Sequence, residues 1–339
     1  MVRFRAILKA VLTAILYYSG ILWLLVCMRL RRRIVVLTYH RVLPTSHHAS
    51  SFSTPGIIVT PETFDLHMRF LRRHFNPVDI NEFARLLRSG ESPAPRTCLV
   101  TFDDGWHDNL EFALPVVQRH QVPATLFVAV DYVGTDQCFW QETLARRLFE
   151  VRHQPGAAGL FEDLGIAVTI SQHPDEARNV IWKMIGELKE KRPDEVPALL
   201  AKLDVMFPVV ANPGVDRFLS WEELSQLSSD GLFWVGSHGM SHTPMTRLAP
   251  DHVRNELRAS RHVIQSRLGS NINSFAYPNG DSDDQVATLV RDAGYAVAFT
   301  TRRGFVTTHD DPMLLPRMNV HESVAGTKAA FLCRVLGLT

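Results

Sequence analysis

The chain alternates short apolar runs with helical segments, and this alternation restricts its fold more than any other feature. Apolar runs of strand length occur at 34–40, 98–102, 124–130, 232–236, 275–277, 295–300 and 314–320. Helical signals lie between them, for example the capped start Thr60-Pro61-Glu62 and the capping box from Ser220 to Glu223. Runs that are apolar throughout are typical of parallel strands buried on both faces and joined by crossover helices. We therefore expect an α/β fold, a distorted (β/α) barrel of about seven strands.

Polar residues stand where several of these runs end. In (β/α) barrels the chemistry lies at the carboxyl ends of the strands, so these residues are candidates for one shared site. They are His40, Asp103, Asp104, His238, His242, Asn279 and His321, with Pro278 in the same turn as Asn279.

Two adjacent carboxylates, Asp103 and Asp104, follow the run 98–102 and precede Gly105. A regular strand would point them to opposite faces, but a strand that breaks into a turn can bring both into one pocket. Unshielded, they would repel and the pKa of one would rise, a conflict that a bound cation removes. One carboxylate would then bind the metal while its neighbour stays free as a base. A solvated Asp-Asp-Gly turn is the alternative.

His238 and His242 lie four residues apart after the run 232–236. Two neutral imidazoles and one carboxylate suit zinc and similar divalent metals, and three protein ligands leave a position open for water or substrate. A pair of surface or core histidines is the alternative for this motif alone.

Three stretches together resemble the polysaccharide deacetylase family, the NodB-homology domains of carbohydrate esterase family 4. They are Thr101-Phe102-Asp103-Asp104-Gly105, the His238–His242 motif, and Tyr277-Pro278-Asn279-Gly280, and the resemblance covers about residues 34–320. The chain departs from the family pattern at Gly239, where a serine or threonine is usual, and it lacks the arginine before the Pro-x-Gly turn. A tryptophan-containing fourth motif and a clean late Leu-x-x-His motif are also missing.

The resemblance implies a metal-dependent hydrolase that removes N-acetyl groups from amino sugars of a polysaccharide or glycan. Asp104, His238 and His242 would hold a divalent metal, most simply Zn²⁺, with Co²⁺, Ni²⁺ or Mn²⁺ as alternatives. Asp103 would be the general base, and the backbone N–H of Asn279 would help to stabilise the oxyanion. His321 is the candidate general acid and His40 its substitute.

Two other hypotheses about the function stay open. One is an amidohydrolase that acts on a small or lipid-linked acyl amide. The other is a non-catalytic glycan-binding barrel in a polysaccharide export system. Metal content together with acetate release separates the enzyme from the binding protein.

The segment 10–28 is apolar and carries no charge, which is close to the roughly 20 residues that cross a bilayer. It ends in Cys27-Met28-Arg29 and further arginines, which argues against cleavage as a signal peptide. We expect residues 1–33 to form an inner-membrane anchor with basic flanks. The side on which the rest of the chain lies is open, and so is a helix that lies in the membrane interface.

The remainder, 34–339, is expected to be the catalytic domain, with a mostly helical insertion at about 139–218. A net charge of +1 favours no polyanion, so nucleic acid is not an expected partner. The expected partners are an N-acetylated polysaccharide and a membrane.

Overall fold

The computed structural model describes residues 11–154, 159, 173–191, 195–207 and 214–339. They fall into two compact units. The described residues within 1–46, 55–135 and 218–339 form the first unit, and those within 47–54 and 136–217 form the second. The second unit takes in nearly all of the stretch for which the sequence predicts a helical insertion.

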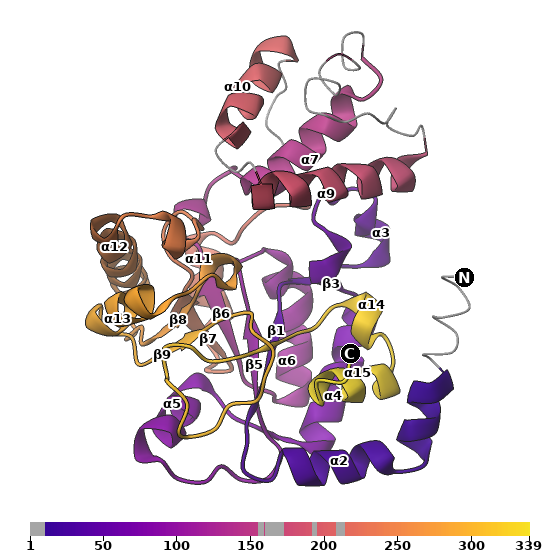
Figure 1. Cartoon of the computed structure of the whole chain (residues 1–339), viewed down its shortest axis with the longest axis vertical. Helices are drawn as coiled ribbons and strands as arrows, with labels where there is room; N and C mark the ends of the chain where they lie inside the picture. The colour runs from indigo at the N-terminus through magenta and orange to yellow at the C-terminus, as the bar shows by residue number, and fades with distance from the viewer. Residues whose placement is uncertain (1–10, 155–158, 160–172, 192–194, 208–213) are drawn as a thin grey trace. The chain divides into compact units, whose positions relative to one another are not determined.

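The first unit is built on a curled parallel sheet (Figure 1). Seven strands follow one another in the order β10-β1-β5-β6-β7-β8-β9, and β4 adds to β5. A bridge from Phe299 to Leu315 brings the segment before β10 alongside β9, the other end of this order. The predicted α/β fold with about seven strands in a curled parallel sheet is confirmed.

The strands are shorter than the apolar runs that predict them. The main sheet consists of β1 (Val35–Tyr39), β4 (Asn76–Pro77), β5 (Thr97–Phe102), β6 (Ala124–Val128), β7 (Phe233–Ser237), β8 (Ser274–Ala276), β9 (Val297–Phe299) and β10 (Met318–Asn319). A separate parallel pair is formed by β2 (Arg41–Val42) and β3 (Ile58–Val59).

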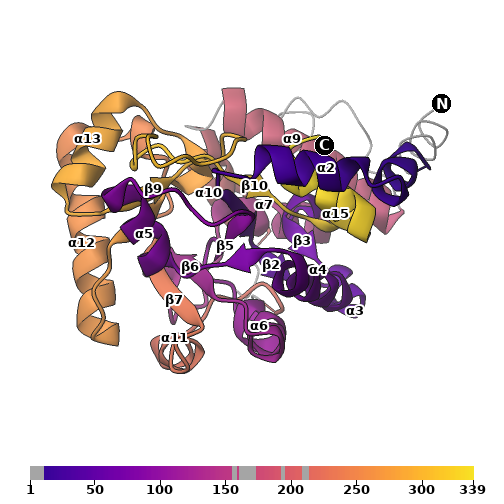
Figure 2. The same ribbon diagram turned by 90° about the horizontal axis from the view of Figure 1, so that it is seen from below.

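Helices surround the sheet (Figures 1 and 2). Those of the first unit are α2 (Ile21–Arg29), α4 (Pro61–His74), α5 (Ile80–Ser89), α6 (Leu114–His120), α11 (Trp221–Leu227), α12 (Pro250–Leu268), α13 (Asp284–Asp292), α14 (Glu322–Ala325) and α15 (Lys328–Val335), with α3 (Thr45–His48) at the boundary. A π-helical turn, Asn109–Ala113, precedes α6, and Pro115 lies in the first turn of α6. The predicted caps at Thr60 and Ser220 are both present.

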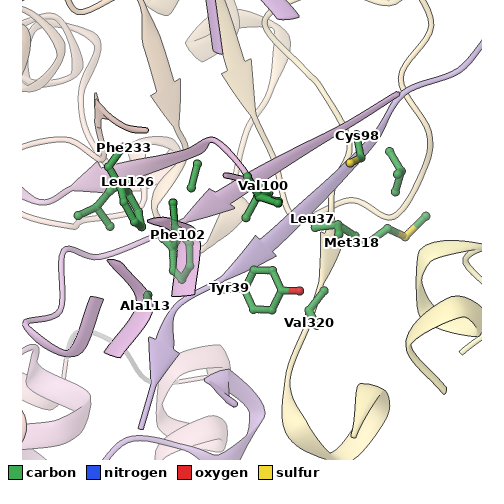
Figure 3. Close-up of a cluster of buried hydrophobic side chains, with 14 of the residues drawn as sticks. Leu37, Tyr39, Cys98, Val100, Phe102, Ala113, Leu126, Phe233, Met318 and Val320 are labelled. Atoms are coloured by element: carbon green, nitrogen blue, oxygen red, sulfur yellow. The ribbon is translucent and has the colours of Figure 1, made fainter. Parts of the chain in front are cut away.

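The two faces of the sheet have separate cores. Side chains alternate along each strand, so Leu37 and Tyr39 pack under the surrounding helices together with Val100, Phe102 and Met318 (Figure 3). Val36, Leu99, Phe127 and Phe299 form the other cluster, to which α5 contributes Ile80 and Phe83. Every second side chain of a strand lies on the same face, so the alternation that places Val36 and Leu99 on this second face also places Thr38 and Thr101 there. Continued past the ends of β1 and β5, it places His40 and Asp103 on the same side, at the carboxyl ends of the strands. The fold thus leads polar residues to the end of the sheet where the site is expected.

The apolar segment near the N-terminus does not form one straight helix. Among the described residues, no single helix has the length and apolar character needed to cross a membrane. The helices Val11–Tyr18 and Ile21–Arg29 have this length and apolar character only when taken together, and the angle between them is 73°. Gly20 lies at the bend with φ 81°, a backbone conformation that glycine adopts easily. The predicted transmembrane anchor is therefore not confirmed, and its first ten residues lie outside the described part.

The second unit is helical where it is described, with α7 (Trp140–Val151), α9 (Pro174–Lys191) and α10 (Val196–Met206). Leucine and isoleucine side chains from all three helices form its own core, which includes Leu148, Ile185 and Leu203. Trp140 and Trp182 pack against this core. Parts of the predicted helical insertion, residues 155–158, 160–172, 192–194 and 208–213, lie outside the described residues.

Candidate active site

The carboxyl end of β5 breaks so that both aspartates point into one site. β5 ends at Phe102, and Asp104 then has φ 81° and Gly105 has φ 94°. A positive φ is costly for a residue other than glycine and persists only where the surrounding structure imposes it. The turn is held because Trp106, fully buried, donates its indole N–H to Asp104 Oδ2 at 2.9 Å. Trp106 is therefore a core residue that orients Asp104, and it does not line a sugar groove.

The two histidines lie on a loop that follows β7 and is shaped by Glu256 of α12. Glu256 accepts hydrogen bonds from the backbone N–H groups of Met240 and Ser241 and from the hydroxyl of Ser241. The loop turns through Gly239 at φ 84°, and His242 has φ 58°. A Cβ atom at Gly239 would lie 3.0 Å from Met245 and 3.2 Å from Glu256. The glycine that departs from the family pattern is thus required by this turn.

Asp104, His238 and His242 converge. Asp104 Oδ1 lies 3.6 Å from Nε2 of His238 and 3.4 Å from Nε2 of His242, and one donor atom from each residue lies within 4.8 Å of the others. Nδ1 of His238 lies 2.7 Å from the carbonyl oxygen of Ala276, which can only accept, so the proton is on Nδ1. In the neutral ring Nε2 then presents a lone pair to Asp104.

The electrostatics of the three residues favour a cation. Burial lowers the pKa of His238 to about 4 in spite of the neighbouring aspartates, so its imidazole is neutral at pH 7. Burial alone would raise the pKa of Asp104, but the hydrogen bond with His242 and the charges of the nearby histidines hold it below its usual value. At His238, a carboxylate oxygen of Asp104 and the lone pair of Nε2 thus face each other without an intervening proton.

The spacing of the donor atoms fits a small divalent ion. Two ligand atoms each about 2.0–2.1 Å from a tetrahedral metal lie roughly 3.4 Å apart. The distances of 3.4 and 3.6 Å from Asp104 to the two histidines are close to that value. The hydrogen bond from His238 to Ala276 is the kind of outer contact that fixes the tautomer of a metal-binding histidine.

Asp103 is not a free carboxylate. Arg317, which immediately precedes β10, donates two hydrogen bonds to it, at 2.7 Å to Oδ1 and 2.6 Å to Oδ2. Arg317 is itself buried and is anchored by the hydroxyl of Thr38 and the carbonyl of Thr300. Burial raises the pKa of Asp103, but the charge of Arg317 outweighs it and the net pKa is below the usual value. Asp103 therefore has a guanidinium partner that favours its ionised form, and its role as general base stays a prediction.

The remaining predicted residues differ in how closely they approach the aspartates. Nε2 of His40 lies 4.0 Å from Asp103 Oδ2, and the ring is partly exposed. His321 lies at the start of α14, where its Nδ1 is 3.0 Å from the hydroxyl of Ser323. Asn279 is exposed in the turn after β8, with φ 61°, and its side chain donates to Asp281. The carbonyl of Ala276, three residues before Asn279, joins this segment to His238.

Sequence reasoning missed Arg317 and Glu256. Arg317 interrupts the otherwise apolar run 314–320, and a charged residue inside a predicted buried strand was a signal that it needs a buried partner. Glu256 carries no comparable signal, because it lies among other charged residues such as Arg254 and Arg258.

A parallel α/β sheet with carboxylates and imidazoles gathered at the carboxyl ends of its strands defines an enzyme-like site of the kind found in metal-dependent hydrolases. Residues 90–298 match the family model described as polysaccharide deacetylase. The chain belongs to the polysaccharide deacetylase family, and the predicted resemblance is confirmed. It is therefore a hydrolase of the class that acts on N-acetyl amide bonds of polysaccharides.

Other comparisons agree with this assignment. A homologue named as a polysaccharide deacetylase, YxkH of Bacillus subtilis (strain 168), is 18% identical over 286 residues, which are 84% of this chain and 74% of that protein. Among solved structures, the deacetylase PplD of Streptococcus pyogenes in complex with acetate has a TM-score of 0.56 at 16% identity and covers 86% of this chain and 94% of its own. The polysaccharide deacetylase BC0361 of Bacillus cereus has a TM-score of 0.57 at 18% identity, with coverages of 90% and 69%. IcaB of Ammonifex degensii has a TM-score of 0.56 at 19% identity, with coverages of 90% and 99%. At these identities the structural likeness supports the fold alone.

Proposed function

We propose that this protein is a metal-dependent N-deacetylase of an amino-sugar polysaccharide. The observation that carries the proposal is the convergence of Asp104, His238 and His242 beside the Asp103–Arg317 pair, in a chain of the polysaccharide deacetylase family. A binding protein has no need of an ionised base next to a cluster of metal-binding side chains.

Asp104, His238 and His242 would hold the metal, with Zn²⁺ as the best fit to one carboxylate and two imidazoles. A bound divalent ion would polarise the acetyl carbonyl and lower the pKa of a water molecule at the site. The chain itself contributes the orientation of the donor atoms: Trp106 holds Asp104, Ala276 holds His238, and Glu256 holds the loop that carries both histidines.

Asp103 would accept the proton of the attacking water as general base. Arg317 would position its carboxylate through two hydrogen bonds and keep it charged between turnovers. The backbone N–H of Asn279 remains our candidate for stabilising the tetrahedral oxyanion.

The leaving amine must gain a proton, and the geometry supports His40 as the donor ahead of His321. The imidazole of His40 lies 4.0 Å from Asp103 and is accessible to solvent in part, so it can reach a substrate bound beside the aspartates. Neither histidine belongs to the part of the chain matched by the family model, residues 90–298.

The direct test is acetate release from a panel of N-acetylated oligosaccharides, with chelator and then with added zinc. We expect release that chelator abolishes and zinc restores, and no release from a small acyl amide. Metal binding without acetate release from any glycan would instead support a non-catalytic binding protein, and release only from the small amide would support the amidohydrolase alternative.

A further inference from the structure

The helix α2 is apolar on two faces, and the fold uses only one of them. Leu22, Val26 and the following Leu30 are fully buried in the main core of the first unit. Ile21, Leu24 and Met28, spaced at i, i+3 and i+7, are 45%, 61% and 67% exposed. This spacing places them on a single face of the helix.

The exposed apolar face continues into the preceding helix. Val11, Leu12, Ile15 and Tyr18 are 50% to 85% exposed. Together with Ile21, Leu24 and Met28 they are exposed apolar side chains on two successive helices, and we call this set the apolar ridge. Large exposed apolar surfaces of this kind mark sites that contact a membrane or another protein.

The buried face holds α2 against the body of the first unit. Trp23 stacks on Phe70 of α4 with ring centroids 5.6 Å apart, and Arg29 donates to the carbonyl of Leu336 just after α15 at 2.7 Å. Figures 1 and 2 both show α2 beside α15. With nine residues, α2 is about 14 Å long, less than half the roughly 30 Å hydrocarbon core of a bilayer. A straight transmembrane helix would have to pull Leu22, Val26 and Leu30 out of the core.

A cluster of arginines follows the ridge directly. Arg31, Arg32 and Arg33 are exposed, and with Arg29 and Met28 they line a hollow of about 670 Å³. The other lining residues are Ser92, Thr307, Thr308 and His309, so no carboxylate of the described residues lines it. Guanidinium groups beside hydroxyl groups offer the donors that a phosphate prefers.

We infer that the apolar ridge and the arginine hollow seat the protein on the surface of an anionic phospholipid bilayer without crossing it. The ridge enters the boundary between head groups and acyl chains, and Arg31, Arg32 and Arg33 bind lipid phosphates. The charge of this cluster selects an anionic bilayer as the partner, because a second copy of the chain would bring the same arginines to the contact.

Attachment through the apolar ridge and the arginine hollow also determines how the candidate site is oriented relative to the bilayer. α2 and its arginines precede β1 and lie at the amino end of the strand, whereas His40 and the aspartates lie at the carboxyl ends of β1 and β5. Five residues of strand separate the two ends by roughly 15 Å. The site therefore opens away from the bilayer, which suits a polymer in solution better than an amide buried among lipid chains.

Vesicle flotation of the full-length protein tests the surface. The wild type should float with phosphatidylglycerol-containing vesicles and much less with phosphatidylcholine alone. Replacing Arg31, Arg32 and Arg33 together by Gln should weaken binding to the anionic vesicles by roughly a hundredfold, since each basic residue near such a surface contributes about a fivefold change. The matched control replaces Arg254, Arg258 and Arg267, which are exposed on α12, and should bind as the wild type does.

The apolar ridge needs its own variants. Leu24→Glu and Met28→Glu should each abolish flotation, while Val205→Glu, at a position 83% exposed on α10, should not. Unchanged binding by the ridge variants, or flotation that ignores vesicle charge, would overturn the inference. A change of oligomeric state in Leu24→Glu without any vesicle binding by the wild type would assign the ridge to a second copy of the chain.

The depth of α2 in the bilayer distinguishes a helix that lies on the membrane surface from one that spans the membrane. Cys27 is exposed on α2, so a fluorophore attached there in a Cys138→Ser background reports on this helix. We expect stronger quenching by a nitroxide near the lipid head groups than by one at the bilayer centre. Stronger quenching from the centre would show that the segment crosses the membrane and would refute the proposal.

Discussion

Asp103 is subject to two opposing influences at the scale of a single residue. Burial favours its neutral form, and the paired guanidinium of Arg317 favours its charged form strongly enough to win. The motif Asp103-Asp104 therefore contains two carboxylates with different partners. One faces two imidazoles and the other faces an arginine, and this difference in partners is what allows them different roles.

Removing Arg317 tests the division of roles. In Arg317→Gln we expect acetate release to fall by about 10²–10⁴-fold, because Asp103 loses the partner that positions and ionises it. Metal content should stay near that of the wild type, since Asp104 and the histidines are untouched. Arg302→Gln, a nearby exposed arginine, is the control, and an equal loss of rate in that variant would contradict the assignment.

Substitution of a proposed metal ligand should instead reduce the metal content as well as the turnover. Asp104→Asn and His238→Ala should lose bound zinc and nearly all turnover together, measured by elemental analysis and acetate release on the same sample. Asp292→Asn, an exposed carboxylate on α13, should retain both. Full zinc content with normal turnover in His238→Ala would exclude the proposed centre.

The loop after β7 is the element that fixes the histidine geometry. Its shape depends on Gly239 at positive φ and on Glu256, which accepts three hydrogen bonds from the loop. The hydroxyls of Ser237 and Ser241 form hydrogen bonds with Ser260 and Glu256, so they help to shape the loop.

Replacing Gly239 by serine, which is usual in the family at this position, should therefore destabilise the protein. Gly239→Ser places a side chain in a left-handed conformation and against Met245 and Glu256, at an expected cost of about 1–3 kcal/mol in the free energy of unfolding. Gly269→Ser has a similar φ but open space around it, so the difference between the two in thermal unfolding isolates the crowding. Equal destabilisation of both would mean that crowding contributes nothing.

At the scale of the whole molecule, buried histidines make stability depend on pH. His67 lies in the main core, stacked on Phe331, with Nε2 donating to Ala325 and Nδ1 accepting from Tyr39. Burial lowers the pKa of His67 to about 4. Between pH 6.5 and 4 the unfolded chain therefore binds a proton at this residue that the folded chain does not.

The resulting stability is complete above pH 6.5 and is lost as the pH falls towards 4, by about 3 kcal/mol. His67→Gln should be less stable at pH 7 but should lose less stability on acidification than the wild type. Urea unfolding at several pH values measures the slope of the free energy of unfolding against pH. The control is His262→Gln, at an exposed position on α12. A slope in His67→Gln equal to that of the wild type would disprove the assignment.

Much of this protein is determined locally and is visible in its sequence. The caps at Thr60 and Ser220, the apolar runs that become strands, and the motifs around Asp103 and His238 depend on residues a few positions apart. The alternation of strands and helices, together with the location of polar residues after the strands, was enough to predict the fold class and to gather most of the candidate site. Strand lengths were overestimated because an apolar run continues into buried loops as readily as into a ladder.

Tertiary structure alone decided two matters. Arg317 reaches Asp103 from 214 positions away, because the sheet order sets β10 beside β1 and β1 beside β5. The segment 10–28 has the composition of a membrane span, yet the chain bends at Gly20, and the helix that follows, α2, buries one face in the main core. Both outcomes depend on which surfaces meet once the chain has folded, and residue order along the chain does not encode that directly.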